Sequence, residues 1–255
     1  MNSADAPLTG THSRQVYSRA PILEAVIDIG VRLPSSSRAD MLKDIAWPDI
    51  GRFGPPQPRV RAAIQLDGAS RTITAQQEPD GWIFSDETQH VVLQARLDGF
   101  ALSRLAPYDR WETFQESAKA CWKAYCDTAK PLDIVRLALR YVNRLDLPLP
   151  FDDFREYLQT YPEVAPALPQ VLSSFVFQLQ APLTDIESGM LVLHEGIVES
   201  PRPDTASILL DIDVFQTVTL PADANELWHA IEALHLKKNE IFEACITDKA
   251  RALIR

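Results

Sequence analysis

Cysteine and long apolar runs are scarce in this sequence, and each scarcity excludes a class of protein. The 255 residues include three cysteines, Cys121, Cys126 and Cys245, which form no disulfide framework and have no metal-ligand spacing. We therefore expect reduced thiols in the core. No apolar run approaches the ~18 residues of a membrane span, and the first residues contain no apolar segment typical of a signal peptide. The sequence predicts a soluble cytoplasmic protein that does not bind a membrane.

Recognised catalytic and cofactor motifs are also missing. The sequence has no Gly-rich phosphate loop, no Gly-x-Ser-x-Gly nucleophile elbow and no His-Glu-x-x-His zinc motif. His229 and His235 lie about 240° apart around a helix, so they do not share a face as metal ligands would. With 25 basic against 35 acidic residues the formal net charge is −10, which disfavours binding to nucleic acid. No metal, cofactor or nucleic-acid partner is therefore predicted.

Two stretches in which polar and apolar residues alternate are the most informative part of the sequence, because such alternation is typical of a half-buried β-strand. In residues 134–147 the polar face would carry Arg136, Arg140 and Arg144, and the apolar face Val135, Leu137, Leu139, Tyr141 and Leu145. In residues 22–33 the polar face would carry Glu24, Asp28 and Arg32, and the apolar face Leu23, Ala25, Ile27, Ile29, Val31 and Leu33. A shift of 112 positions lays Glu24 on Arg136, which predicts equivalent strands of a duplicated fold.

Helix, strand and turn signals follow the same order in the two halves of the chain. Short helices are predicted at 38–45 and 152–159, and long helices at 110–129 and from 225 onward, the last either continuing to 254 or ending near Thr247. Further strands are predicted at 60–66, 72–76, 82–84, 91–97, 100–105, 175–180, 190–194 and 208–215. The dipeptides Asp67-Gly68, Asp80-Gly81 and Asp98-Gly99 predict turns. Asp109 and Asp223, each three residues before a glutamate, predict helix starts.

The predicted fold is α+β: a module of strand, helix, antiparallel strands and helix that occurs twice, with an antiparallel sheet, long helices on one face and a polar open face. Residues 1–16 are expected to form a disordered tail. Residues 17–130 would form the first repeat and residues 131–255 the second, the two halves making one compact unit. By order of elements the arrangement resembles the TATA-binding-like and helix-grip folds, an analogy that says little about function.

The polar face of the two equivalent strands is the candidate binding site. Antiparallel pairing at the centre of the sheet would bring Glu24 and Asp28 within reach of the arginines. One interpretation is a ladder of cross-strand ion pairs, each contributing ~0.2–1 kcal/mol. The other is an anion site, because arginine presents paired donors that match carboxylate or phosphate. Two carboxylates stand against four central arginines, which leaves an excess of positive charge at Arg32, Arg136, Arg140 and Arg144.

Three further residues, His90, His194 and Asp211, are secondary candidates on the same face. His90 and His194 fall on predicted strands, where either could act as an acid or base, although neither has a nucleophile in recognisable context. Asp211 and Asp213 are two positions apart, so their carboxylates would share one face of a strand. A deep pocket that brings His90 or His194 together with Asp211 would favour an enzyme, whereas a shallow and fully ion-paired surface would favour binding or a structural role.

Several short patches resemble a sporadically distributed family of uncharacterised bacterial proteins of about this length. They are Pro21-Ile22-Leu23-Glu24-Ala25 with Ile27-Asp28, then Arg140-Tyr141-Val142-Asn143-Arg144, and Leu234-His235 with Phe242 and Ile246-Thr247-Asp248. The family supplies no activity, cofactor or substrate. The resemblance implies that Glu24, Asp28, Arg140, Asn143, Arg144 and His235 belong to a shared pattern. Asn143 falls on the core-facing side, where its amide needs partners; otherwise it marks a β-bulge or a strand end, which would change the direction of Arg144.

The sequence therefore favours a non-enzymatic binding protein whose open sheet face binds a small anionic ligand or a protein partner. The competing hypothesis is an enzyme that acts on a phosphate- or carboxylate-bearing small molecule through the His, Asp and Arg residues of that face. A homodimer is a further hypothesis, because the C-terminal helix from Glu226 onward is long enough to pack against a copy of itself.

Overall fold

A computed structural model describes residues 17–48, 53–67, 72–86, 88, 90–170 and 172–255, except that nothing is described of the side chains of 61–77. The predicted tail, residues 1–16, and the turn at Asp67-Gly68 lie wholly or partly outside the described residues. The strands are β1 (Ile22–Arg32), β2 (Gln57–Asp67), β3 (Thr72–Asp86), β4 (Val91–Arg96), β5 (Gly99–Leu105), β6 (Asp133–Pro148), β7 (Val176–Leu183), β8 (Gly189–Val198) and β9 (Thr205–Leu220). The helices are α1 (Trp111–Ala129), α2 (Glu226–Cys245) and α3 (Asp248–Ile254), with two short 3₁₀ helices, η1 (Ala39–Leu42) and η2 (Phe154–Glu156).

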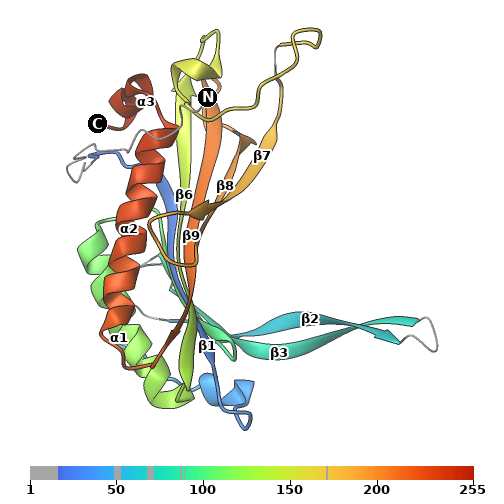
Figure 1. The fold of residues 1–255 in the computed structure, drawn as a ribbon, viewed down its shortest axis with the longest axis vertical. Helices are drawn as coiled ribbons and strands as arrows, with labels where there is room; N and C mark the ends of the chain where they lie inside the picture. Colours follow the sequence, from blue (N-terminus) through green and yellow to red (C-terminus); the bar gives the residue numbers. More distant parts are fainter. Residues whose placement is uncertain (1–16, 49–52, 68–71, 87, 89, 171) are drawn as a thin grey trace, which may run out of the picture.

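The described strands form one antiparallel sheet of nine strands in the order β2-β3-β4-β5-β1-β6-β9-β8-β7. The three α-helices lie to one side of it, and the β2–β3 hairpin projects away from the rest of the sheet (Figure 1). Strands of both halves of the chain therefore share one sheet. The predicted α+β class with an antiparallel sheet is confirmed.

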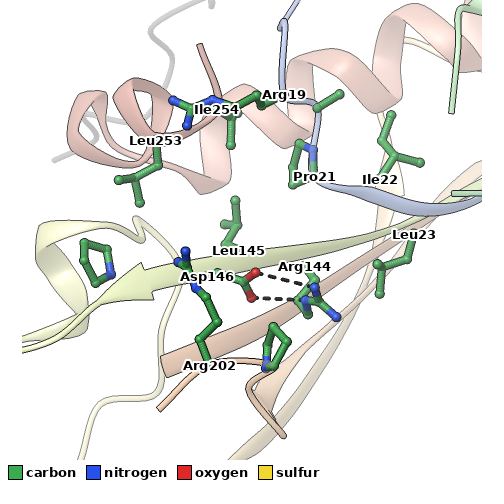
Figure 2. Close-up of a pocket in the computed structure, with 13 residues that line it drawn as sticks. Arg19, Pro21, Ile22, Leu23, Arg144, Leu145, Asp146, Arg202, Leu253 and Ile254 are labelled. Atoms are coloured by element: carbon green, nitrogen blue, oxygen red, sulfur yellow. Dashed lines mark hydrogen bonds and ion pairs between the residues drawn. The ribbon is translucent and has the colours of Figure 1, made fainter. Parts of the chain in front are cut away.

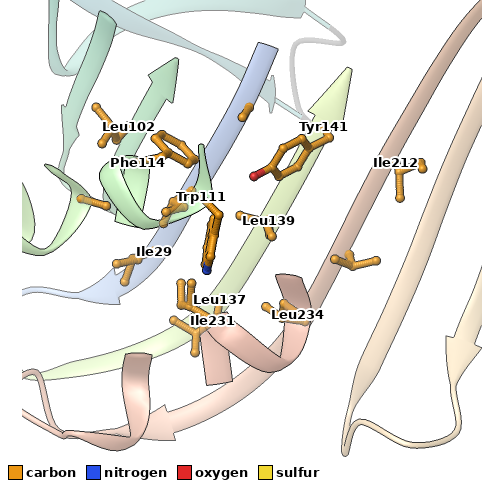
Figure 3. Packing of buried hydrophobic residues seen from close by; sticks show 14 of the residues in the cluster. Ile29, Leu102, Trp111, Phe114, Leu137, Leu139, Tyr141, Ile212, Ile231 and Leu234 are labelled. Atoms are coloured by element: carbon orange, nitrogen blue, oxygen red, sulfur yellow. The ribbon is translucent and has the colours of Figure 1, made fainter. Parts of the chain in front are cut away.

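The apolar core lies between the helices and one face of the sheet. Helix α1 packs against β5, and α2 packs against β6 and β9. Trp111 from α1, Ile231 from α2 and Leu137 of β6 are buried members of this one cluster (Figure 3). The opposite face of the central strands carries the polar residues because successive side chains of a strand point to opposite sides.

The two strands predicted to be equivalent are neighbours at the centre of the sheet. β1 and β6 pair antiparallel, with Ile27 opposite Leu139 and Val26 opposite Arg140. The predicted core face of β1 is confirmed for Ala25, Ile27, Ile29 and Val31, which are all buried, whereas Leu23 and Leu33 are only partly buried.

One prediction for β6 is wrong, namely that Val135 lies in the core. Val135 is exposed, whereas Ile134 is fully buried. The register between β1 and β6 shifts between Ile134 and Arg136, which marks a β-bulge or similar irregularity. An extra residue at that place reverses the side-chain alternation before Arg136 and leaves it unchanged after.

Asn143 points into the core, as its place in the alternation predicts. Its Nδ2 donates to the carbonyl oxygens of Leu210 at 3.0 Å and Tyr141 at 3.3 Å. A register shift does occur opposite Asn143, but it lies between Ile22 and Glu24, and β6 continues to Pro148. Arg144 therefore keeps the direction that the alternation predicts.

Several predicted boundaries differ from the structure. β3 is continuous through Asp80-Gly81, so the predicted turn there is wrong. Gly81 does not have a positive φ; it lies where a β-carbon would collide with the main chain of Ala95 in the neighbouring strand. The turn at Asp98-Gly99 does connect β4 to β5.

The two short helices are one 3₁₀ turn each instead of eight residues. In the first, Leu42 at the end of the turn is buried, and so is Ile45, which lies beyond it. In the second, Asp153 accepts a hydrogen bond from the Arg155 amide at 2.8 Å and caps the turn.

The ends of the long helices can also be compared with the predicted ends. Helix α1 has Arg110, not Asp109, at its N-cap, without a side-chain cap. Helix α2 ends at Cys245, which agrees with the predicted end near Thr247 and not with a helix that continues to 254. Thr247 then caps α3, accepting from the Ala250 amide at 3.3 Å. Within the described ranges, no helix is both long enough and apolar enough to cross a membrane.

Candidate functional site

The three arginines of β6 lie on the sheet face that the helices leave uncovered. Arg136, Arg140 and Arg144 alternate with the core-facing residues of the strand, and their side chains are one third to one half exposed. Each of them pairs with a carboxylate from the same strand or from a neighbouring one.

Arg140 makes the most directional of these contacts. Its Nε donates to Asp211 Oδ1 at 2.8 Å and its Nη2 to Asp211 Oδ2 at 2.7 Å. Asp211 lies on β9, two positions from Asp213, the residue opposite Arg140, so the pair is diagonal; the Asp211 side chain is only 5% exposed. The hydrogen bonds that Arg140 donates to Asp211 raise the pKa of Arg140. The fork of two parallel bonds is the geometry in which arginine binds a carboxylate most strongly.

Arg136 lies between two carboxylates. Its Nη1 donates to Asp28 Oδ1 at 3.3 Å, its Nη2 lies 3.7 Å from Asp213 Oδ2, and its guanidinium carbon lies 4.5 Å from the centroid of the Phe215 ring. Arg96 of β4 donates to the other oxygen of Asp28 at 2.7 Å. Asp28 thus pairs with arginines from both halves of the chain. Burial raises the pKa of Asp213.

The remaining predicted site residues also interact with groups of opposite charge. Arg32 pairs with Asp133. Arg144 Nε donates to Asp146 Oδ1 at 3.1 Å, and Ser207 Oγ donates to the same oxygen at 2.6 Å. Glu24 lies on this face, and its charge attracts Arg140.

From the sequence, only Glu24 and Asp28 were set against the four arginines, with Asp211 and Asp213 placed elsewhere on the same face; the structure brings four further carboxylates to the arginines. They are Asp133, Asp146, Asp211 and Asp213, all within 4 Å of one of the four arginines. The excess of positive charge inferred for the central strands therefore disappears, which favours the ion-pair ladder over an anion site there.

Of the secondary candidates, His194 and Asp211 lie close together, whereas His90 lies apart from both. His194 Nδ1 lies 3.5 Å from Asp211 Oδ2 without a hydrogen bond. His90 is in the turn before β4, with a positive φ of 53°, so its prediction as a strand residue is wrong. Strands β4 and β9 are four positions apart in the sheet, or about 19 Å. His90 therefore cannot share a site with His194 and Asp211.

A groove does open at one end of the arginine row, where β1 begins. It has a volume of about 550 Å³ and lies among the start of β1, the end of β6, the loop before β9 and helix α3 (Figure 2). Its lining combines charged and apolar side chains: Arg19, Arg144, Asp146 and Arg202, with Ala20, Pro21, Ile22, Leu23, Leu145, Pro148, Pro201, Leu253 and Ile254.

Charge is unbalanced in this groove, unlike in the centre of the sheet. Three arginines line it against the single carboxylate of Asp146. Arg19 Nε is held by the main-chain oxygen of Arg255 at 3.1 Å, and Arg202 has only a loose contact with exposed Asp204, at 3.7 Å. Of the residues that line the groove, Arg144 was predicted from the sequence to bind an anion. Arg19 and Arg202 carried no sequence signal, because each lies in an irregular segment.

No cluster of metal-binding side chains was found in the part of the chain that the structure describes. Comparisons of the chain with protein-family models, curated proteins and solved structures found no match.

Proposed function

We propose that the protein is a non-enzymatic binding protein that holds a small carboxylate- or phosphate-bearing ligand in the groove between Arg19, Arg144 and Arg202. The proposal rests on the charge of the lining residues, because three guanidinium groups line the groove and only one carboxylate does. The proposal keeps the anionic ligand predicted from the sequence and moves it to the end of the arginine row.

The chemistry of the groove supports a ligand with both an anionic and an apolar part. Guanidinium groups match carboxylate and phosphate oxygens in geometry as well as in charge. Next to them stand Leu23, Leu145, Leu253 and Ile254, which can cover a hydrocarbon portion. A volume of about 550 Å³ is within the ~300–1,000 Å³ typical of small-molecule sites.

Calorimetric titration with inorganic phosphate and with hexanoate tests the proposal, because the two probes separate the anionic contact from the apolar one. We expect Arg144→Gln to weaken binding by about tenfold or more, as the loss of a charge-assisted hydrogen bond predicts. Arg155→Gln is the matched control, since Arg155 also lies within 4 Å of an aspartate two positions away but is not part of the groove. Equal affinity in wild type and Arg144→Gln would refute the proposal.

The same titration separates the groove from the central open face. If the ligand is confined to the groove, Arg140→Gln keeps the affinity of the wild type. Loss of binding in Arg140→Gln, with Arg144→Gln unaffected, would instead place the anion at the centre of the sheet, where the sequence predicted it.

A second candidate function is hydrolysis at His194. The imidazole lies 3.5 Å from Asp211, and a carboxylate beside a histidine can orient it as a general base. Neither of the two cavities described for this protein contains His194, which makes this candidate weaker. Hydrolysis of p-nitrophenyl phosphate or acetate that disappears in His194→Asn would support it.

The duplication of the fold is likewise our proposal. The offset of 112 positions maps Ile27 onto Leu139, and these two residues face each other in the β1–β6 pair. A pseudo-twofold axis through this pair would relate the two strands. In each half a strand is followed by a short 3₁₀ helix, antiparallel strands and a long helix, which supports the proposal.

A homodimer through α2 and a cytoplasmic location also remain proposals. The apolar stripe of α2, including Leu227, Ile231 and Leu234, is buried in the chain's own core. Leu236 is exposed and is available for contact with a copy. Size-exclusion chromatography with light scattering at several concentrations tests the dimer, and a strict monomer would refute it.

A further inference from the structure

A second cavity lies on the helical side of the sheet, away from the arginine row. It has a volume of about 330 Å³ and opens between the start of α1, helix α2 and the central strands. Its lining is rich in aromatic rings: Tyr17, Tyr108, Trp111, Tyr141, His235 and Phe242. Trp111 and His235 stack face to face, with their centroids 4.0 Å apart, and the hydroxyl groups of Tyr108 and Tyr141 are hydrogen-bonded at 2.9 Å.

One lysine amine lies in this aromatic cavity. Lys238 of α2 is only 7% exposed, and its Nζ lies 3.7 Å from the centroid of the Tyr141 ring. It makes no hydrogen bond or ion pair with any residue that the structure describes. A buried ammonium without a carboxylate partner is costly, so the amine favours its neutral form. Burial lowers the pKa of Lys238 to about 7, even though the charge of Glu243 acts in the opposite direction.

The acidic groups around the cavity are directed to other partners. Glu243 is bound by Arg251 at 2.6 Å and accepts a hydrogen bond from Tyr17 at 2.6 Å. Glu240, which also lines the cavity, pairs with Lys237. The titratable and charged groups that line the cavity with Lys238 are Tyr17, Tyr108, Asp109, Arg110, Glu112, Tyr141, His235, Glu240 and Glu243. Acids outnumber bases in this set, which disfavours an anionic ligand.

We propose that Lys238 is a nucleophilic amine that forms an imine with a small uncharged aldehyde or ketone, preferably one bearing an aromatic or other apolar substituent. The nitrogen lone pair forms a bond to the carbonyl carbon, the carbonyl π electrons move to oxygen, and a proton passes from nitrogen to oxygen. The resulting carbinolamine loses water to give the imine. The reaction is a condensation and requires no oxidant or reductant.

The geometry provides the three conditions that this reaction requires. The amine lies at the wall of a cavity large enough for a benzaldehyde-sized molecule. No carboxylate of the described residues forms an ion pair with the Lys238 amine, so none holds it in the protonated form. The aromatic rings in its lining can pack against an apolar substituent. A structural role for Lys238, a cation held over Tyr141, would require none of these.

Reductive trapping tests the proposal directly. Folded wild-type protein is treated with benzaldehyde and sodium cyanoborohydride at pH 7, and the N-benzyl adducts are located by peptide mass spectrometry. We expect Lys238 to be modified at least about tenfold faster than the exposed lysines, because an amine buried among aromatic rings without a carboxylate partner is more readily available in its neutral, nucleophilic form. In urea this preference should disappear, because it depends on the folded cavity.

A matched pair of variants strengthens the test. Lys238→Met keeps an unbranched side chain of similar length and should remove the fast adduct, whereas Lys237→Met should keep it, since Lys237 is held by Asp185 and Glu240 outside the cavity. If Lys238→Met does not fold, the peptide map of the wild type decides alone. Modification of exposed lysines at a rate equal to or above that of Lys238 would overturn the proposal.

Discussion

Arg140 and Asp211 form a two-bond ion pair across β6 and β9, with donor–acceptor distances of 2.8 and 2.7 Å. The aspartate is almost fully buried, whereas the arginine is 47% exposed. Removal of Arg140 would therefore leave the buried charge of Asp211 without its strongest partner.

Arg140→Ala should for this reason destabilise the fold by about 1–3 kcal/mol, the typical cost of leaving a buried polar group unsatisfied. Urea denaturation measures the effect. Arg32→Ala is the control, because Arg32 is 67% exposed and its pair with Asp133 should contribute no more than ~1 kcal/mol. Equal losses in the two variants would show that the bond to Asp211 has no special weight.

A second prediction concerns Glu195, a buried residue on the core face of β8. Neither of its carboxyl oxygens has a hydrogen-bond partner among the described residues, and burial raises its pKa to about 8. Because the folded pKa lies above the unfolded value, the protein loses stability as pH rises between about 4.5 and 8. Glu195→Gln should remove this loss and be more stable than wild type by about 2 kcal/mol or more at pH 8–9, with little difference near pH 4.

Chemical denaturation across this pH range measures the Glu195 effect. Glu199→Gln, at an exposed position just beyond the same strand, is the control and should leave the pH dependence unchanged. A gain in stability from Glu195→Gln that is the same at pH 4 and pH 9 would contradict the assignment, since it would not arise from titration.

A third prediction concerns the stability effect of Lys238 and does not depend on imine formation. Its folded pKa of about 7 lies below the ordinary lysine value, so the wild type loses stability as pH falls from about 10 through 7. Lys238→Met should therefore be more stable than wild type by about 2 kcal/mol or more at pH 6, with the difference shrinking toward pH 10. Parallel pH profiles for wild type and Lys238→Met would show that the amine stays charged in the folded protein.

The sequence predicted the central strands well because their alternation is long and regular. It located the core face of β1 and the outward direction of Arg136, Arg140 and Arg144. Val135 was misplaced because a register irregularity is not visible in a pattern of hydrophobicity. His90 was misplaced because the strand that follows it begins only at Val91.

The partners of the arginines could not be predicted in the same way. Asp211 and Asp213 were recognised as sharing one face, but their contact with Arg140 and Arg136 depends on the register of β6 with β9, which no local signal sets. Asp133 and Asp146 lie on β6 itself and were overlooked, although Asp146 follows Arg144 by the two positions that share a strand face.

Lys238 did carry a signal in the sequence. It follows Leu234 by four positions and precedes Phe242 by four, so it lies on the apolar stripe of the helix. A lysine inside such a stripe indicates either a buried amine or a break in the pattern. The groove around Arg144 gave no comparable signal, because its walls come from four separate segments of the chain.

The central claim, an anion bound beside Arg144, is tested most directly by crystals soaked in selenate, whose anomalous signal locates the ion without bias. The account predicts a selenate in the groove among Arg19, Arg144 and Arg202 of the wild type, and no selenate there in crystals of Arg144→Gln. Selenate bound beside Arg140 or elsewhere on the sheet, with an empty groove in the wild type, would contradict it.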